Sequence, residues 1–169
     1  MHIDHERSGR APCARRTGIT GWAPLPLRLL IGFGFMAHGW AKLLRGPETF
    51  IATLAHLGVP LPHVMGWLTV LVELAGGLAV LLGAFTLLAS VPLAAIMLVA
   101  MFTVHLPYGF SSIKLQAVTA AGPQFGPPGY EVSLLYLAAL VTLVLGGAGP
   151  WSVDGWRARR TVSAARSPR

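Results

Sequence analysis

Long apolar runs, separated by short polar or proline-rich stretches, dominate the middle of the chain. We expect a membrane-spanning helix from each of four runs, over residues 24–44, 64–82, 87–106 and 131–145. The hydrocarbon core of a bilayer is about 30 Å thick, and a helix needs about 20 residues to cross it. The first three runs meet that length, whereas the fourth is shorter and is expected to begin among the headgroups. The pattern predicts an all-α protein, an integral membrane four-helix bundle.

The connections between the runs differ in length and composition. Residues 45–63 predict a loop with a short amphipathic turn near Phe50 before two prolines stop regular structure. Residues 83–86 form a tight, uncharged turn, so the second and third helices are expected to be antiparallel neighbours. Pro92 falls early in the third run and marks either its first turn or a kink. Residues 107–130 hold four prolines and four glycines and predict an irregular loop.

Basic residues gather in the two tails. Nine arginines flank the apolar runs: Arg7, Arg10, Arg15, Arg16, Arg157, Arg159, Arg160, Arg166 and Arg169. By the positive-inside rule both termini are cytoplasmic, which agrees with four spans and turns the two longer loops outward. We therefore divide the chain into a disordered basic tail (1–22), a transmembrane domain (23–156) and a second basic tail (157–169). The expected location is the bacterial cytoplasmic (inner) membrane.

Composition narrows the class of protein further. The chain is 54% hydrophobic and only 11% charged, against about 25% charged residues in a typical soluble domain. The net charge of +7 lies in the tails and comes with no recognition motif, so nucleic acid is not an expected partner. The expected partners are the lipid bilayer, a redox enzyme and further copies of the chain.

Two other interpretations of the N-terminal region fail on the residues. A cleaved signal peptide would not contain Arg28, His38 and Lys42, and no small-x-small cleavage site follows the first run. Cys13 is the single cysteine, so the chain has no internal disulfide and no C-x-x-C redox pair. It also precedes the first apolar run, whereas a lipoprotein cysteine follows one.

Ionisable residues inside the predicted spans are the candidate chemistry, because a central charge costs about 2.5–3.5 kcal/mol to insert. At about 100° per residue, the first helix places Arg28, His38 and Lys42 within one third of its circumference, together with Gly32 and Gly39. Glycines on such a face allow another helix to pack closely. On the second helix, a glutamate and two glycines share a face in the same way: Gly66, Glu73 and Gly77.

Depth along the helices predicts which of these groups meet. Glu73 lies near the midplane and needs a cation or a proton, for which Lys42 is the best-placed partner and Arg28 the second. Arg28 itself lies near the cytoplasmic boundary. Five groups are expected to converge in the outer half of the bundle: His38, Lys42, Glu73, His105 and Glu131.

The residues leave two interpretations open. Lys42 and Glu73 form either a structural ion pair that fixes helix packing or part of a polar pocket that handles protons or a small redox ligand. His105 and Glu131 are also compatible with simple roles at the ends of helices. Haem ligation by His38 and His105 is disfavoured, because two histidines alone are a weak signal. No metal site is expected.

Five motifs in order give the chain a family resemblance. It resembles the DoxX family of small bacterial membrane proteins over about residues 25–156. Two departures concern the outer loop: Tyr108 stands where the family pattern has asparagine, and residues 111–128 lack clear counterparts. The matching motifs are Arg28 with GFMAHGWAKL at 34–43, LVELAGG at 71–77, HLPYGF at 105–110, GYE at 129–131 and GAGPWSVD at 147–154.

The resemblance implies a role beside membrane redox chemistry. Family members look like oxidoreductase subunits of thiosulfate or quinol oxidation, or are linked to oxidative stress, thiol homeostasis and quinone resistance. It implies catalytic roles for four residues, Arg28, His38, Lys42 and Glu73. It also implies cofactor-binding roles for His105 and Glu131, with quinone as the best-suited cofactor. The alternative is a non-catalytic scaffold or assembly partner, or a small-solute permease.

Overall fold

The computed structural model describes residues 19–165 and shows a mostly helical protein, as the sequence predicted. Cys13, the arginines of the N-terminal tail, Arg166 and Arg169 lie outside the described residues. Within the described part, two helical stretches are long and apolar enough to cross a membrane, Pro62–Leu82 and Thr86–Tyr108.

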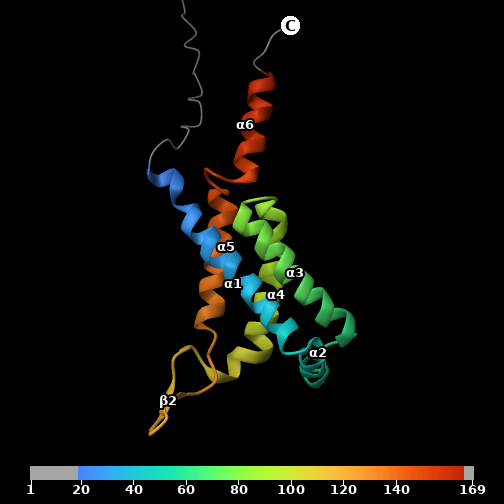
Figure 1. Cartoon of the computed structure of the whole chain (residues 1–169), viewed down its shortest axis with the longest axis vertical. Helices are drawn as coiled ribbons and strands as arrows, with labels where there is room; N and C mark the ends of the chain where they lie inside the picture. The colour runs from blue at the N-terminus through green and yellow to red at the C-terminus, as the bar shows by residue number, and fades with distance from the viewer. Residues whose placement is uncertain (1–18, 166–169) are drawn as a thin grey trace, which may run out of the picture.

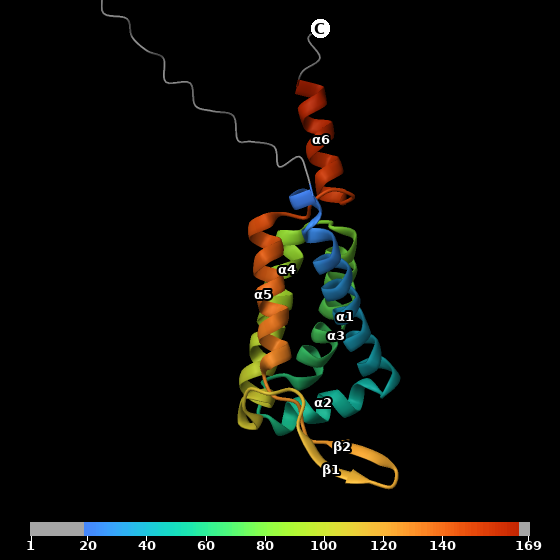
Figure 2. The same ribbon diagram turned by 90° about the vertical axis from the view of Figure 1, so that its left-hand side faces the viewer.

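Four long helices run alongside one another (Figures 1 and 2). They are α1 (Pro24–Leu44), α3 (Pro62–Leu82), α4 (Thr86–Ala100) and α5 (Glu131–Gly146). After α4 the chain continues through a π-helix, η2 (Met101–His105), and a 3-10 turn, η3 (Leu106–Tyr108). With η2 and η3 counted as the continuation of α4, these bounds lie within two residues of the predicted runs, because apolar length and flanking turn residues are both visible in the sequence.

The bundle has two distinct ends. At the tail end, α1 and α4 begin and α3 and α5 finish, next to η1 (Ile19–Trp22). A further helix, α6 (Val153–Ala165), projects beyond this end (Figure 1). At the loop end lie α2 (Pro47–His56) and a two-stranded hairpin (Figure 2).

Two connecting segments, residues 45–63 and 107–130, are more regular than the sequence predicted. The short turn near Phe50 is the complete helix α2, and Pro62 begins α3 rather than preceding it. Pro47 and Pro62 are the first residues of α2 and α3. Proline suits this position, because the amide hydrogen that it lacks would have no partner in the first turn of a helix. The segment 107–130 is not wholly irregular, because β1 (Leu115–Thr119) pairs antiparallel with β2 (Gly122–Phe125).

The hairpin corrects the expected irregular loop, and α6 covers part of the basic C-terminal tail. The turn between the strands is fixed by Gly122 at φ +113° and by the Thr119 hydroxyl, which donates to the Gly122 carbonyl. The number of prolines and glycines in this segment did not predict this local hydrogen bonding. The boundary expected at residue 156 falls inside α6, because Ser152 caps the helix by accepting the Gly155 amide.

Helices α1 and α3 pack against each other through glycines. A Cβ atom on Gly32 would lie 2.7 Å from the Gly77 carbonyl oxygen, so neither position has room for a side chain. The core around this contact is filled by apolar residues of all four helices, including Phe35, Val80 and Leu140.

The face of α1 opposite its ionisable residues is largely exposed. Leu29, Phe33 and Trp40 are exposed there, whereas Met36 is half-buried beside Gly77. Met36 turns inward because Gly77 leaves space for its flexible side chain.

Candidate functional site

The centre of the candidate site is an ion pair between α1 and α3. Lys42 Nζ lies 2.5 Å from Glu73 Oε2 and donates to both carboxylate oxygens. Glu73 is buried, with 3% of its surface exposed, although it sits in the middle of an apolar helix. The predicted partnership of Lys42 with Glu73 is therefore confirmed. A carboxylate at this depth is stabilised only while its cation stays in place.

The helix surfaces explain why these two side chains meet. Gly39 lies one turn before Lys42, and a Cβ there would approach the Glu73 Cβ to 3.2 Å. The glycine therefore brings α3 close enough for the lysine to reach across. From α2, the Phe50 ring lies 4.6 Å from Lys42 Nζ and adds a cation–π contact.

The ion pair lines a cavity of about 690 Å³ at the loop end. Helices α3 and α4 separate towards this end, and α2 crosses it (Figures 1 and 2). The lining is largely apolar, with His38, Lys42, Glu73 and His105 among the exceptions. Its volume falls in the ordinary range for small-molecule sites, about 300–1,000 Å³. Four of the six predicted site residues therefore share one cavity.

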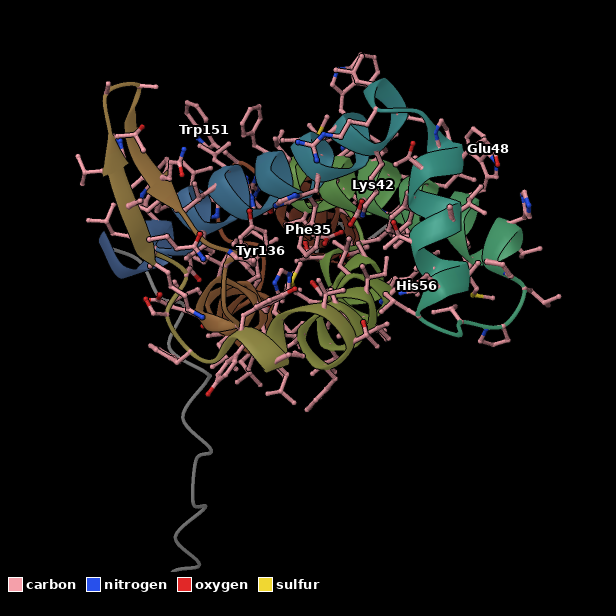
Figure 3. All side chains as sticks on the ribbon, turned by 90° about the horizontal axis from the view of Figure 1, so that it is seen from below. Phe35, Lys42, Glu48, His56, Tyr136 and Trp151 are labelled. Atoms are coloured by element: carbon pink, nitrogen blue, oxygen red, sulfur yellow. The ribbon has the colours of Figure 1, made fainter. Side chains whose placement is uncertain are left out.

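Helix α5 adds two residues that the sequence analysis missed. Ser133 and Tyr136 lie one turn apart and both line the cavity. The Tyr136 ring meets Phe35 edge-on at 5.1 Å and His38 at 6.2 Å between centroids. Seen from the loop end, Phe35, Lys42 and Tyr136 lie within the ring of helices, whereas Glu48 lies on the outer side of α2 (Figure 3).

Tyr136 reaches the cavity through a space that Gly34 leaves on α1. Its hydroxyl occupies the position where a side chain on Gly34 of α1 would begin. Gly34 belongs to the motif around His38, so the motif provides room for a phenol from α5 as well as the histidine itself.

Helix α4 is irregular where it borders the cavity. Pro92 stands inside the helix and removes one backbone amide from its hydrogen-bond ladder. Further on, the π-helix η2 contributes Thr103, Val104 and His105 to the lining. Single π-helical turns are rare and occur frequently at functional sites. His105 is fixed by a hydrogen bond of 3.1 Å between Nδ1 and the Pro128 carbonyl oxygen.

The remaining two predicted residues lie elsewhere. Glu131 starts α5, and its carboxylate accepts the Ser112 amide at 3.0 Å without lining the cavity. Arg28 lies at the tail end, so the prediction that Arg28 is the second-best partner for Glu73 is wrong. The helical-wheel angle was right, but Arg28 precedes Lys42 by 14 positions, about 21 Å along the axis.

Arg28 belongs to a separate cluster at the tail end. It is 2% exposed and donates to the carbonyl oxygens of Ala148 and Trp151, the latter at 3.0 Å. Gly83, in the turn between α3 and α4, lies against the guanidinium, with 2.8 Å from Arg28 Nη1 to the position of a Cβ. The guanidinium thus ties the segment after α5 to α1.

Asp154 completes this tail-end cluster. Its carboxylate accepts the amides of Phe85 and Thr86 at 2.8 and 2.9 Å, and thereby caps the start of α4. Burial alone would raise the pKa of Asp154, but these backbone bonds, the Thr86 hydroxyl and Arg157 outweigh it and hold the pKa below its ordinary value. The closing motif GAGPWSVD is thus a structural connection between helix ends.

Comparison with known proteins identifies the family. The DoxX family model matches residues 23–106. An uncharacterized protein of Haemophilus influenzae is 30% identical over 130 residues, which cover 76% of this chain and 85% of that protein. This chain belongs to the DoxX family. An uncharacterized membrane protein of Mycobacterium tuberculosis is 28% identical over 144 residues, 81% of this chain and 82% of that protein. No solved structure matches.

The DoxX match identifies a membrane protein and covers most of the candidate site. Residues 23–106 include Arg28 and the four cavity residues His38, Lys42, Glu73 and His105. Ser133, Tyr136 and the capping Asp154 lie beyond the matched region. Among residues 19–165 no group of three histidine, cysteine or acidic side chains could hold a metal ion. The polar part of the site is one ion pair with neighbouring histidines and hydroxyls.

Proposed function

We propose that this DoxX-family protein spans the bacterial inner membrane four times and binds a quinone-type ring in its cavity as part of a membrane redox system. Its α1 and α3, at 21 residues each, are about 31 Å long, which matches a hydrocarbon core. Large apolar side chains are exposed on all four helices, for example Leu30, Leu71, Leu88 and Leu145. In water such a surface would be unfavourable, whereas lipid accommodates it.

The orientation follows from the arginines at the tail end. Arg157, Arg159 and Arg160 lie on α6, which projects from this end (Figure 1). The positive-inside rule then assigns the tail end to the cytoplasm. The loop end, with α2, the hairpin and the cavity, faces outward.

The observation that supports ligand binding is an ion pair between the buried Glu73 and the half-buried Lys42 that borders a cavity instead of being enclosed by packed side chains. A purely structural ion pair would be enclosed by packed side chains, because empty space beside it would remove van der Waals contacts. Here Lys42 and Glu73 share their cavity with His38, Tyr136 and Ser133. These groups offer hydrogen bonds to ring oxygens, while the apolar lining suits the ring faces.

The chemistry proposed for the pair is proton exchange. Reduction of a quinone to a quinol takes up two electrons, which a partner redox enzyme supplies, and two protons. Lys42 and His38 donate hydrogen bonds to the ring oxygens, and Glu73 accepts or releases a proton as the ring changes state. Arg28 takes no direct part, because it lies in the tail-end cluster.

Quinone retention in lipid nanodiscs tests the proposal. Protein incubated with dimethylnaphthoquinone, a ring without a chain, is purified, and the retained quinone is extracted and measured against empty nanodiscs. Wild type is expected to retain quinone and Glu73→Gln to lose it. Glu131→Gln is the matched control, because it makes the same change at a carboxylate outside the cavity. Equal retention by wild type and Glu73→Gln would remove the proton role.

A non-catalytic partner role is the second candidate, and α6 is the observation that favours it. This helix extends past the bundle and presents arginines, including Arg160 stacked on Trp156 at 3.7 Å. Such a surface suits an acidic partner protein. Wild-type protein that co-purifies with a redox enzyme, and loses it when Arg157, Arg159 and Arg160 become glutamine, would support this role.

A further inference from the structure

The cavity has a polar end and an apolar side. Its polar groups lie on α1, α3 and α5, where Lys42, Glu73 and Tyr136 come together. The walls contributed by the lower parts of α3 and α4 are apolar, with Leu68 and Val99 on opposite sides. A ligand that fits both parts therefore has a polar head and an apolar extension.

The apolar side is open towards the surface of the bundle. Leu68 is 50% and Val99 53% exposed, although both line the cavity. The two helices separate from their shared turn at the tail end, so the space between them widens towards the loop end (Figures 1 and 2). In a four-span arrangement this wedge between α3 and α4 faces the acyl chains of the bilayer.

Two other sides of the cavity are closed by packing. Helix α1 packs tightly on α3 through Gly32 and Gly77, with no room for even a Cβ atom between them. On the outward side α2 crosses the cavity, with Ile51 filling the space beside Gly66. Among the large apolar residues that line the cavity, Leu68 and Val99 on the wedge are the most exposed.

We propose that the physiological ligand is a lipid-soluble quinone whose ring lies against Lys42 and Glu73 and whose isoprenoid chain lies in the wedge between α3 and α4. This inference rests on the proposed function and adds the chain, the access route and the residues that accommodate them. The irregularities of α4 fit this role. Pro92 and the π-helix η2 both line the cavity from the α4 side, and π-helical turns are frequent at functional sites.

Filling the wedge tests the inference. Leu68→Trp and, separately, Val99→Trp place a bulky ring in the space assigned to the chain. Each has a matched control on the same helix, Leu71→Trp and Leu98→Trp, at exposed positions that do not line the cavity. The probes are dimethylnaphthoquinone and a menaquinone, which is the same ring system with an isoprenoid chain.

Both wedge variants are expected to lose the menaquinone by about tenfold or more relative to wild type, the effect of overpacking a filled site. They should retain dimethylnaphthoquinone as wild type does, and the two controls should retain both quinones. Undiminished menaquinone retention in both wedge variants would overturn the inference while leaving the proposed ring site standing. If wild type retains neither quinone, the ring site and the wedge inference both fail.

Discussion

Each end of the bundle holds a charged side chain of α1, Arg28 or Lys42, but the two side chains are bonded differently. At the tail end, Arg28 donates to two backbone carbonyl oxygens and Asp154 accepts two backbone amides, so both charges are bonded to the backbone of connecting segments and helix ends. At the loop end, Lys42 and Glu73 satisfy each other and face a cavity. Residues of one family motif therefore divide between a structural connection and a candidate binding site.

This difference shows that burial of a charge does not by itself identify function. Arg28 is as buried as Glu73, at 2% against 3% exposed. What separates them is the neighbouring space, since Arg28 is surrounded by backbone and Gly83, whereas Glu73 borders an open volume. Each prediction below perturbs one side of this comparison.

The largest effect is expected from breaking the ion pair on one side only. Lys42→Met leaves Glu73 buried without its cation, which should lower the free energy of unfolding by about 3–5 kcal/mol. The double variant Lys42→Met/Glu73→Met replaces the pair by apolar side chains and should recover most of that loss. Thermal unfolding in detergent, followed by circular dichroism, measures both. A double variant that is no more stable than Lys42→Met would show that the loss of stability does not come from leaving Glu73 without its cation.

Removal of Arg28 is expected to have the next largest effect, and on stability alone. Arg28→Met leaves the carbonyls of Ala148 and Trp151 without their charged donor, at a cost of roughly 3 kcal/mol. The loss should appear in thermal unfolding. Dimethylnaphthoquinone retention per folded molecule should match wild type, because the cavity lies at the opposite end. A specific loss of quinone in a folded Arg28→Met protein would break the division between the two ends.

The close contact between Gly32 of α1 and Gly77 of α3 sets how near the two helices approach each other. Gly77→Ala would bring a Cβ within 2.8 Å of the Gly32 carbonyl oxygen. Overpacking of this kind costs about 1–3 kcal/mol. Gly146→Ala is the control, since a Cβ there meets nothing within 4 Å. Equal thermal stability of the two variants would show that the helices approach less closely than described.

The smallest effect is expected at Asp154. Asp154→Asn weakens the cap on α4 and should cost about 1 kcal/mol at neutral pH. Because the folded-state pKa of Asp154 is lowered, its contribution is present above the unfolded value of about 3.9 and is lost as pH falls through the folded pKa. The stability difference between wild type and Asp154→Asn should therefore shrink below about pH 4. A difference that persists unchanged there would contradict the charged cap.

Much of the helical framework was predictable, because apolar length and turn residues are local properties of the sequence. The Lys42–Glu73 pairing followed from helix geometry, since both lie on glycine-bearing faces at similar depth. Arg28 shows the limit of that reasoning. Its angle on α1 matched the stripe, but its partners are backbone carbonyls about 120 residues away, which no side-chain pattern reveals.

The rest of the site depended on packing between distant segments. Tyr136 reaches the cavity because Gly34 leaves room for its hydroxyl, a pairing of α1 with α5 that periodicity does not encode. The cavity itself arises from the separation of α3 and α4, and so from the whole bundle. The hairpin was obscured because prolines and glycines flank and close it, although they also permit its turn.

The most direct test of the account compares how much a ligand stabilises the wild-type protein with how much it stabilises a variant whose ion pair is replaced by apolar side chains. Thermal unfolding of wild type and of Lys42→Met/Glu73→Met is measured with and without dimethylnaphthoquinone. At a ligand concentration about 100 times its Kd, wild type should gain about 2.7 kcal/mol. The double variant should be folded and gain much less, since it lacks Lys42 and Glu73 and keeps only His38, Tyr136 and Ser133 as hydrogen-bonding groups for the ring oxygens. Equal stabilisation of both proteins would contradict the claim that this ion pair serves the ligand.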